Sequence, residues 1–321
     1  MDYAKSVLTP EAEAFLAEWR DGADTVAART SGSTGVPKEI RLKKCDMLAS
    51  ARATVEFFGL GPSSLLLLPL STSYIAGKMQ VVRALVADCA LVAEQPSSSP
   101  LSRWQGGRIS LLPVVPSQLP GLMSSPAFGL IDNLIIGGAP LSPDAESSLV
   151  DSGVKAYATY GMTETCSHVA LRRVGTDLFK ALPGFTFSTD ERGCLVIDSS
   201  SLSFGRLVTN DVVELCSPQS FVWKGRADNV INSGGVKIHP EEVERVLLPM
   251  LPSGVTAYVT SRRSNRWGEE AVVVTDSPLV TSGLLSRLRR ILGPIHCPKD
   301  VIVLPEIPRT DISGKIKREK F

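Results

Sequence analysis

Residues 30–38 read TSGSTGVPK, and the elements on both sides of this segment define the fold class. Gly32 and Gly35 let backbone N–H groups point inward, and side-chain donors add to them. These donors belong to Thr30, Ser31, Ser33, Thr34 and Lys38. The combination predicts a phosphate-binding loop. A Walker loop is disfavoured because Lys38 follows Pro37 and no serine or threonine comes next, whereas a flexible Gly/Ser linker remains an alternative.

Short strands are predicted on both sides of this segment, at 26–29 and 39–42, after a helix that begins at Thr9 and Pro10. Strands and helices then alternate: helix 46–58, strand 65–70, a helix opened by Gly77, and strands 90–93 and 109–115, followed by strand 134–136, helix 143–150 and strand 154–159. This order predicts an α/β fold whose sheet is mostly parallel. In such sheets ligands bind beyond the carboxyl ends of the strands, where GGAP (137–140) and YGMTE (160–164) are found.

After Leu171 the strands become short and are separated by turns, which predicts a small antiparallel section. From Ala227 onward helices and strands mix again over enough residues for a small α+β domain. We therefore expect a large domain over residues 1–226 and a smaller, mobile domain over residues 227–321, with the boundary between Arg226 and Asp228.

The composition argues against several classes of protein. Lys and Arg total 34 against 33 for Asp and Glu, so bulk electrostatic capture of nucleic acid or of an anionic membrane is not expected. The longest apolar run, 65–70, is too short to span a bilayer. The N-terminus lacks the pattern of a signal peptide, which predicts a cytoplasmic location. Six cysteines without CxxC spacing and three histidines predict neither a zinc site nor a disulfide framework.

Six motifs in order resemble the signature of the AMP-forming acyl-CoA synthetases and adenylation domains. They are TSGSTGVPK (30–38), IIGGAPL (135–141), YGMTET (160–165), TND (209–211), KGRADNVINSGGVKIHPEEVE (224–244) and PRTDISGKIKR (308–318). The resemblance implies a ligase that uses ATP, Mg²⁺ and CoA. In the implied reaction a carboxylate attacks the α-phosphate of ATP to give an acyl-adenylate and pyrophosphate, and a thiol then attacks the activated carbonyl.

The resemblance places the residues after the central strands around the nucleotide. It implies that Thr163 contacts the α-phosphate, that Glu164 holds Mg²⁺ and that residues 30–38 hold the other phosphates. A magnesium ion bound by few carboxylates and several phosphate oxygens is chemically ordinary; alternatively, Glu164 caps the next helix. The residues implied at the adenine are Gly137, Gly138, Ala139, Tyr160 and Gly161. The glycines alternatively form a tight turn.

The later motifs are implied to contact the ribose and to move. Asp211 matches an aspartate that accepts hydrogen bonds from the ribose hydroxyls, although Asn210 stands where the family usually has glycine. Asparagine tolerates the same left-handed conformation. Arg226 matches an arginine that reaches the ribose or phosphate, and its alternative is a surface salt bridge. Asp228 occupies the hinge position about which the small domain swings.

Two features near the C-terminus are also assigned by the resemblance. Lys315 would bridge the substrate carboxylate and the α-phosphate, offsetting the repulsion between two anions in the transition state; otherwise it belongs to a solvated basic tail. Gly234 and Gly235 would line the passage of the pantetheine arm, and the alternative for them is a simple β-turn.

The segments CSHVALRR (166–173) and PLSTSYIAGKMQVVRAL (69–85) most resemble the o-succinylbenzoate:CoA ligases of menaquinone biosynthesis. This implies a dicarboxylic aromatic keto acid as substrate, with Ser73, Tyr74, Lys78 and His168 as its expected polar contacts. A histidine in an apolar strand is often structural, and Lys78 could equally lie on the surface. Many relatives have histidine at the position of Tyr74 and a longer region before Thr30, so we expect either a compact ligase or a surface completed by another chain, as in a homo-oligomer.

Three functions stay open at this point. The first is the o-succinylbenzoate:CoA ligase, with the acid, ATP and CoA as partners and neither nucleic acid nor a membrane span. The second is a ligase of the same mechanism for another aryl or acyl acid, or an adenylation enzyme that loads a carrier-protein thiol. The third is a non-catalytic adenylate-binding module, against which Glu164, Asp228 and Lys315 argue.

Overall fold

The structure is a computed structural model of the 321-residue chain and describes residues 6–29, 39–252, 254–280, 282–309 and 316–321. Its helices are α1 (Pro10–Arg20), α2 (Lys44–Phe58), α3 (Ile75–Ala87), α4 (Leu119–Met123), α5 (Pro143–Asp151), α6 (Pro240–Leu247) and α7 (Ser282–His296). α1 begins as predicted, because the Thr9 side chain accepts a hydrogen bond from the backbone N–H of Ala12.

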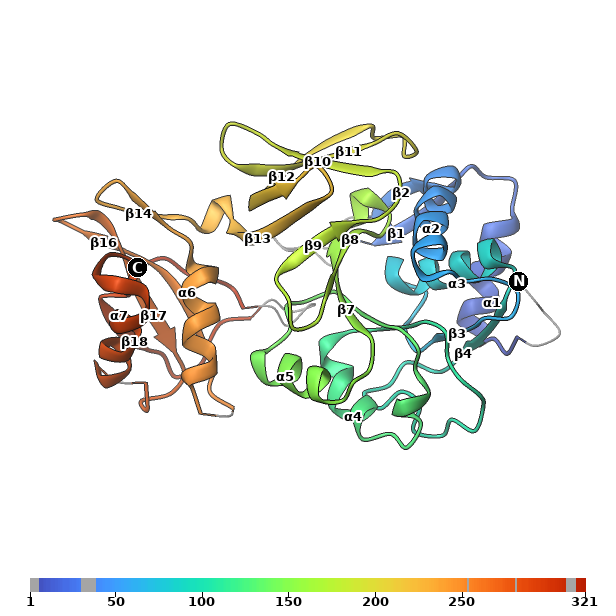
Figure 1. The fold of residues 1–321 in the computed structure, drawn as a ribbon, viewed down its shortest axis with the longest axis horizontal. Helices are drawn as coiled ribbons and strands as arrows, with labels where there is room; N and C mark the ends of the chain where they lie inside the picture. The colour runs from blue at the N-terminus through green and yellow to red at the C-terminus, as the bar shows by residue number, and fades with distance from the viewer. Residues whose placement is uncertain (1–5, 30–38, 253, 281, 310–315) are drawn as a thin grey trace.

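A nine-stranded sheet is the centre of the molecule (Figure 1). Its strands are β5 (Leu112–Val114), β6 (Leu134–Ile136), β7 (Ala156–Gly161), β8 (His168–Arg173), β9 (Leu178–Ala181), β10 (Phe185–Thr189), β11 (Cys194–Ser199), β12 (Arg206–Ser217) and β13 (Ser220–Arg226). Their order across the sheet is β10-β11-β12-β13-β9-β8-β7-β6-β5. β5, β6 and β7 are parallel, and β8 pairs antiparallel with β7. The predicted α/β class is confirmed, and the parallel and antiparallel sections form one continuous sheet.

Three further sheets complete the fold. β1 (Thr25–Arg29) and β2 (Glu39–Lys43) form an antiparallel pair, and β3 (Leu65–Leu68) and β4 (Ala90–Ala93) a parallel pair. The five-stranded sheet contains β14 (Ile231–Ser233), β15 (Val236–Ile238), β16 (Ala257–Ser264), β17 (Gly268–Thr275) and β18 (Asp300–Val303). The predicted strands on either side of residues 30–38 are confirmed, and they are paired with each other.

The elements after β13 have a hydrophobic core of their own. Val259 and Val273 on the five-stranded sheet pack with Leu247 of α6 and Leu288 of α7 in one buried cluster. In Figure 1 these elements gather at one side of the molecule, with the N-terminus at the other. A separate core is what a small C-terminal domain requires, but the boundary at Arg226–Asp228 and the mobility of this part stay predictions.

The start of α3 differs from the predicted one. The helix begins at Ile75, whereas Gly77 was expected to open it. Gly77 lies inside the first turn, where an added Cβ would be 2.2 Å from the carbonyl oxygen of Ser71. The glycine is therefore required by the close approach of the preceding loop and not by the helix start.

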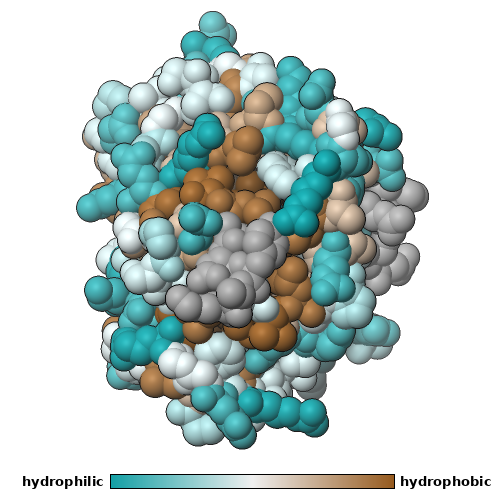
Figure 2. All heavy atoms as spheres, turned by 90° about the vertical axis from the view of Figure 1, so that its right-hand side faces the viewer, coloured by the Kyte–Doolittle hydropathy of each residue, from teal (hydrophilic) through white to brown (hydrophobic). Residues whose placement is uncertain are grey.

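Hydrophobic residues gather around the middle of the face drawn in Figure 2, which is the right-hand side of Figure 1. Apolar groups exposed together are typical of surfaces that contact other molecules. This face is therefore the first place to look for the homo-oligomer that stays a prediction. Over the described part of the chain, no helix is both long and apolar enough to cross a membrane.

Candidate active site

Tyr160, Asp211 and Arg226, one residue from each of three predicted motifs, lie together with Trp223 on β7, β12 and β13. The Tyr160 hydroxyl donates to Asp211 Oδ2 at 2.7 Å, and the indole N–H of Trp223 donates to Asp211 Oδ1 at 3.2 Å. Arg226, opposite Asp211 in the β12–β13 ladder, has its Nη1 3.9 Å from Asp211 Oδ1. Three strands separate β7 from β12 in the sheet order, so the sheet must curl to bring these side chains into contact.

The Tyr160 ring is fixed by aromatic neighbours. Its centroid lies 5.8 Å from that of Phe179 and 5.1 Å from that of Phe221, and both contacts are edge-to-face. Burial, and then the Asp211 carboxylate, raise the pKa of the Tyr160 phenol well above its ordinary value of 10. The phenol therefore stays protonated and donates to Asp211 at every physiological pH.

The predicted hinge residue contacts the same group. Arg226 Nη2 donates to Asp228 Oδ2 at 2.9 Å, and the Asn210 side-chain amide lies 3.3 Å from both carboxylate oxygens of Asp228. The Asn210 oxygen also accepts from Arg192 Nη1 at 3.0 Å. Asparagine in place of the usual glycine therefore gives the hinge position a contact that glycine cannot make.

The YGMTET segment forms a tight turn between β7 and β8. Thr163–Thr165 is a single 3₁₀ turn, and the Thr165 hydroxyl bonds to the backbone of Met162 and to the Ser167 carbonyl. An added Cβ on Gly161 would lie 2.3 Å from that same Ser167 carbonyl oxygen, so only glycine fits there. Strand and turn therefore pack directly against each other beside the residues predicted to contact adenine.

Glu164 is exposed on this turn, and its carboxylate has no hydrogen bond or ion pair with the described residues. The bonds that close the turn come from Thr165, so the alternative in which Glu164 acts as a helix cap finds no support. In the described ranges, no group of three or more His, Cys, Asp or Glu side chains is arranged to hold a metal. One free carboxylate suits an Mg²⁺ ion whose other ligands are phosphate and water oxygens.

The glycine segment after β6 lies beside the end of β7. Gly137 donates its N–H to the Val114 carbonyl at 3.1 Å, and an added Cβ there would lie 2.5 Å from Thr159 Oγ1. Gly138 has a φ of +88°, and Ala139 is exposed. The predicted adenine-side residues of both motifs therefore share one edge of the sheet.

Two predicted groups lie outside the described residues: Thr30, Ser31, Gly32, Ser33, Thr34, Gly35 and Lys38 in one, and Lys315 in the other. The residues that border them are placed. Arg29 pairs with Glu39 across the β1–β2 ladder, and Arg309 bridges Ile316. Beyond Lys315, both Nη atoms of Arg318 donate to the Glu244 carboxylate on α6, and Nη1 also donates to the Val259 carbonyl on β16.

Gly234 and Gly235 connect β14 to β15. Gly234 donates its N–H to the Trp267 carbonyl at 2.8 Å, and Gly235 donates to Asn232 Oδ1 at 3.2 Å. These bonds fit the β-turn alternative, and a passage for pantetheine stays a prediction.

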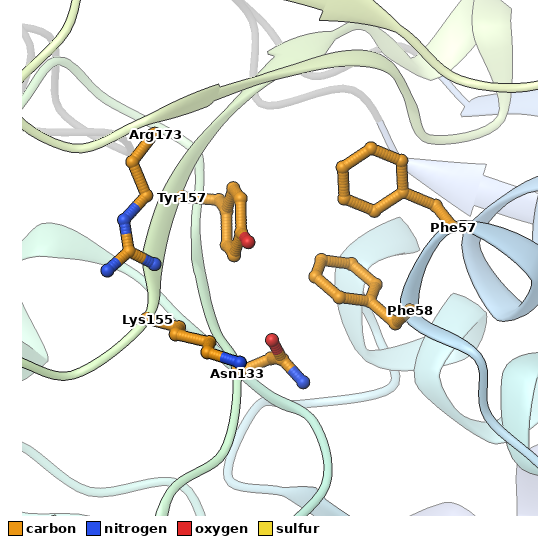
Figure 3. A pocket seen from close by; sticks show the side chains of 6 residues that line it. All are labelled: Phe57, Phe58, Asn133, Lys155, Tyr157 and Arg173. Carbon is orange, nitrogen blue, oxygen red and sulfur yellow. The ribbon is translucent and has the colours of Figure 1, made fainter.

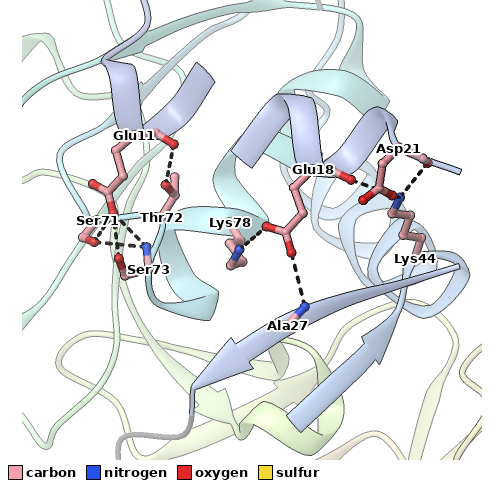
Figure 4. A network of polar contacts seen from close by, with 9 residues as sticks. All are labelled: Glu11, Glu18, Asp21, Ala27, Lys44, Ser71, Thr72, Ser73 and Lys78. Atoms are coloured by element: carbon pink, nitrogen blue, oxygen red, sulfur yellow. Dashed lines mark hydrogen bonds and ion pairs between the residues drawn. The ribbon is translucent and has the colours of Figure 1, made fainter. Parts of the chain in front are cut away.

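Ser73 and Lys78, two of the expected acid contacts, have partners on α1 (Figure 4). The Glu11 carboxylate accepts hydrogen bonds from the hydroxyls of Ser71 and Ser73 and from the Ser73 N–H. The ammonium of Lys78 is buried, lies 2.8 Å from Glu18 and sits over the Phe15 ring. Neither residue is a free donor in this conformation, whereas the Tyr74 side chain is exposed.

His168 belongs to a chain of hydrogen bonds inside the molecule. Its Nε2 lies 3.1 Å from Thr54 Oγ1, and Thr54 in turn donates to the Ser50 carbonyl. Its Nδ1 lies 3.4 Å from the Ser167 hydroxyl, which accepts from Arg83. Burial, and then the charge of Arg83, lower the pKa of His168 well below 6.5. A neutral imidazole with both nitrogens satisfied favours the structural alternative for His168, and a substrate contact stays a prediction.

Arg83 is the feature that the sequence did not reveal. Its side chain, on α3, is only 2% exposed, and burial lowers the pKa of its guanidinium to about 9. Nη2 donates to Ser167 Oγ at 2.7 Å and Nη1 to Gln80 Oε1 at 3.3 Å, while Nε has no hydrogen-bond partner in the described ranges. Within the described residues it forms no ion pair with a carboxylate. A buried cation of this kind is costly unless an anion compensates it.

Gln80 orients this group. Its amide nitrogen donates to the carbonyls of Leu67 and Leu111, so its oxygen must face Arg83. Ser167, which receives the guanidinium, follows the YGMTET turn by two residues and is half-buried. The guanidinium of Arg83 is therefore connected through the Ser167 side chain to the turn that carries Thr163 and Glu164.

Comparison with known proteins identifies the family. The model of the family described as "AMP-binding enzyme" matches residues 24–198, which is more than half of the chain. The chain therefore belongs to the AMP-binding enzyme family, in the class of AMP-forming acid:CoA ligases.

Its relatives include ligases for different acids. The chain is 27% identical to the 2-succinylbenzoate–CoA ligase of Enterococcus faecalis, over 91% of this chain and 68% of that protein. It is also 27% identical to the indoleacetate–CoA ligase of Aromatoleum aromaticum, over 90% of this chain and 65% of that protein. The chain thus spans about two thirds of the length of both.

A solved structure matches the chain over nearly its whole length. It is the acyl-CoA synthetase (AMP-forming)/AMP-acid ligase II-like protein of Dyadobacter fermentans, 32% identical with a TM-score of 0.66. The match covers 98% of this chain and 94% of that chain.

Proposed function

We propose that this protein converts o-succinylbenzoate to o-succinylbenzoyl-CoA through an acyl-adenylate, and thereby acts in menaquinone biosynthesis. The relatives support a CoA ligase, and two of them act on different acids, 2-succinylbenzoate and indoleacetate. The observation that favours a dicarboxylic acid is Arg83, a buried guanidinium without a carboxylate partner among the described residues.

The argument from Arg83 is electrostatic. A dicarboxylic substrate has one carboxylate that reacts. Its second carboxylate does not react, but it must lose its hydration when the substrate binds. Burial of that second charge is favourable only against a cation or several hydrogen-bond donors. The unpaired Nε–H of Arg83 can supply such a donor, with the charge of the guanidinium, beside the turn that carries Thr163.

The adenylation step is proposed to use the residues assembled around Tyr160. The Tyr160 ring faces the adenine, Asp211 accepts from the ribose hydroxyls, and Glu164 has a free carboxylate for Mg²⁺. The magnesium ion would neutralise phosphate charge. A substrate carboxylate oxygen attacks the α-phosphorus and the bond to pyrophosphate breaks. The CoA sulfur then attacks the acyl carbon, and AMP leaves.

The decisive experiment is ATP–pyrophosphate exchange across a panel of acids, followed by mass detection of the CoA thioester. We expect o-succinylbenzoate to give the fastest exchange and a thioester with free CoA. If it fails while simple benzoates, indoleacetate or fatty acids work, the proposed substrate is wrong. Exchange without any CoA thioester would instead indicate loading of a carrier protein, and absence of exchange with all acids a non-catalytic adenylate-binding module.

Lys315 is proposed to stabilise the adenylation transition state, although it lies outside the described residues. We expect Lys315→Ala to abolish acyl-adenylate formation and to leave thioesterification of supplied acyl-adenylate largely intact. Lys317→Ala removes an exposed cation two residues away and is the matched control. Full exchange activity of Lys315→Ala, or an equal loss in Lys317→Ala, would refute the assignment.

A further inference from the structure

A cleft of about 450 Å³ opens beside the residues where β6 and β7 begin (Figure 3). It is lined by Phe57, Phe58, Asn133, Lys155, Tyr157 and Arg173. Pockets of a few hundred Å³ are of the size that binds small molecules.

The strand pairing explains why these residues meet. β6 and β7 run parallel and begin side by side, with the Leu134 N–H donating to the Lys155 carbonyl at 2.9 Å. Asn133 and Lys155 therefore lie at the starting edge of the sheet, whereas Gly137 and Gly161 lie where the same strands end. Arg173 joins them because it is paired with Tyr157 across β7 and β8.

One side of the cleft is aromatic. Phe57 and Phe58 are the last residues of α2, and their rings face Tyr157 in Figure 3. The ring centroids are 6.0 Å apart for Phe57 and Tyr157 and 5.4 Å apart for Phe58 and Tyr157, with edge-to-face geometry in both pairs. Phe57 is 37% exposed, so part of this aromatic surface lies open to the cleft.

The other side is cationic. The Arg173 guanidinium lies 5.3 Å from the centre of the Tyr157 ring and, among the described residues, donates only to the Val154 carbonyl. Lys155 is exposed and has no acidic partner among the described residues. The adjacent carboxylate in the chain, Asp132, is bonded to Arg108 and does not line the cleft. Two positive charges therefore line the cleft, and no carboxylate of the described part of the chain is on its walls.

We propose that this cleft is a second binding site, separate from the candidate active site, for a small aromatic carboxylate. The ring of such a ligand packs against Phe57 and Phe58, where its apolar surface leaves water. Its carboxylate meets Lys155 and Arg173, which hold charge-assisted hydrogen bonds to it. An anion without a ring leaves the aromatic side exposed, and a neutral ring leaves both cations unpaired.

The position of the cleft makes it independent of the proposed reaction. Tyr157 and Tyr160 are three residues apart on β7, a separation of roughly 10 Å along a strand. Their neighbours differ, since Tyr160 contacts Asp211 and Tyr157 contacts the end of α2. Binding in the cleft can therefore be tested whether or not the enzyme accepts o-succinylbenzoate.

The test is residue-specific protection measured by mass spectrometry, because an aromatic acid could also enter the active site. Exposed lysines are acetylated with an N-hydroxysuccinimide ester while phthalate, an aromatic dicarboxylate, is raised to about 10 mM, which reaches weak sites. We expect acetylation of Lys155 to slow with saturation. Lys180, exposed on β9 and outside the cleft, is the internal control and should react at a constant rate.

Two further arms test the ligand class. Phe57→Ala should raise the phthalate concentration for half-protection of Lys155 by about tenfold, since a ring contact is lost. Half-protection of Lys155 by inorganic phosphate or by cyclohexane-1,2-dicarboxylate should need at least about fivefold higher concentrations than half-protection by phthalate. The proposal is overturned if phthalate does not protect Lys155 or if it protects Lys180 equally. It is also overturned if phthalate protects Lys155 as well in Phe57→Ala as in the wild type and the two non-aromatic anions protect the wild type as well as phthalate does.

Discussion

The replacement of Arg83 by methionine is the sharpest test of how the acid is chosen. Methionine has a similar length and no charge, so it fills the site on α3 while removing the donor to Ser167 and the unpaired Nε–H. If the second carboxylate of the substrate is held there, the variant should lose its preference for a dicarboxylic acid and keep the adenylation chemistry.

The magnitude follows from burial. Arg83 is 2% exposed, so its interaction with a carboxylate is hardly screened by water. Removing one partner of a buried charge pair costs about 2–4 kcal/mol, which corresponds to a loss of about 30-fold to 1,000-fold in kcat/KM. Stability should change little, by less than about 2 kcal/mol, because the desolvation penalty of the guanidinium disappears with it. The Gln80 oxygen loses its donor, which limits that gain.

The assay compares one diacid with two monoacids. o-Succinylbenzoate is measured beside 4-oxo-4-phenylbutanoate and 2-butanoylbenzoate, each of which lacks one of its carboxylates. ATP–pyrophosphate exchange gives kcat/KM for the wild type and for Arg83→Met, and thermal unfolding verifies the fold. We expect the variant to lose activity on the diacid while the monoacid that retains the reactive carboxylate is converted as well as by the wild type.

Two results would refute this reasoning. An equal loss on the diacid and on the reactive monoacid would mean that Arg83 supports the fold of the turn and not the substrate. An unchanged diacid preference in a well-folded Arg83→Met variant would mean that the second carboxylate binds elsewhere. Arg83→Lys separates charge from geometry, since lysine keeps the cation but not the planar donor group.

Three further predictions concern neighbouring features. His168 is held neutral in the fold, so below about pH 6.5 the unfolded chain binds one more proton, and the free energy of unfolding should fall there by up to about 1.4 kcal/mol per pH unit. Denaturant unfolding of His168→Gln should show a smaller difference in this free energy between pH 5.0 and pH 7.5 than the wild type does. An equal difference in both proteins would contradict the prediction. Gly161→Ala forces a Cβ against the Ser167 carbonyl and should lower the unfolding free energy by about 1–3 kcal/mol in thermal melts; a wild-type melting temperature would disprove the clash. Asn210→Gly removes a contact to Asp228 and should change the rate of thioester formation while leaving pyrophosphate exchange within about twofold; identical thioester rates would mean that this contact does not hold the hinge.

The order of motifs predicts much of the fold and of the nucleotide side of the site. β7 and the turn after it come from an apolar run that ends in Tyr160 and Gly161, which local patterns can identify. The hydrogen bond between Tyr160 and Asp211 spans 51 residues and depends on the curl of the sheet. Family resemblance places both residues near the nucleotide, whereas composition and periodicity do not.

The acid side is where sequence patterns fall short. Ser73 and Lys78 resemble free polar donors, yet their partners Glu11 and Glu18 lie about 60 residues earlier, on a helix whose docking no local signal reports. At Arg83 the error is the opposite one, because the sequence analysis did not single out this residue. It stands in VVRALV, where apolar residues on both sides indicate a helix buried on several faces, and an arginine in such a run was the available signal.

The hydrogen bond between Tyr160 and Asp211 has a kinetic consequence. The carboxylate proposed to receive the ribose accepts one hydrogen bond on each oxygen, from the Tyr160 hydroxyl and from the Trp223 indole. Each carboxylate oxygen can accept a second hydrogen bond, so a ribose hydroxyl would add to an acceptor that is already oriented. The same two donors would hold Asp211 in place as AMP departs, so this side chain would need no rearrangement before the next nucleotide binds.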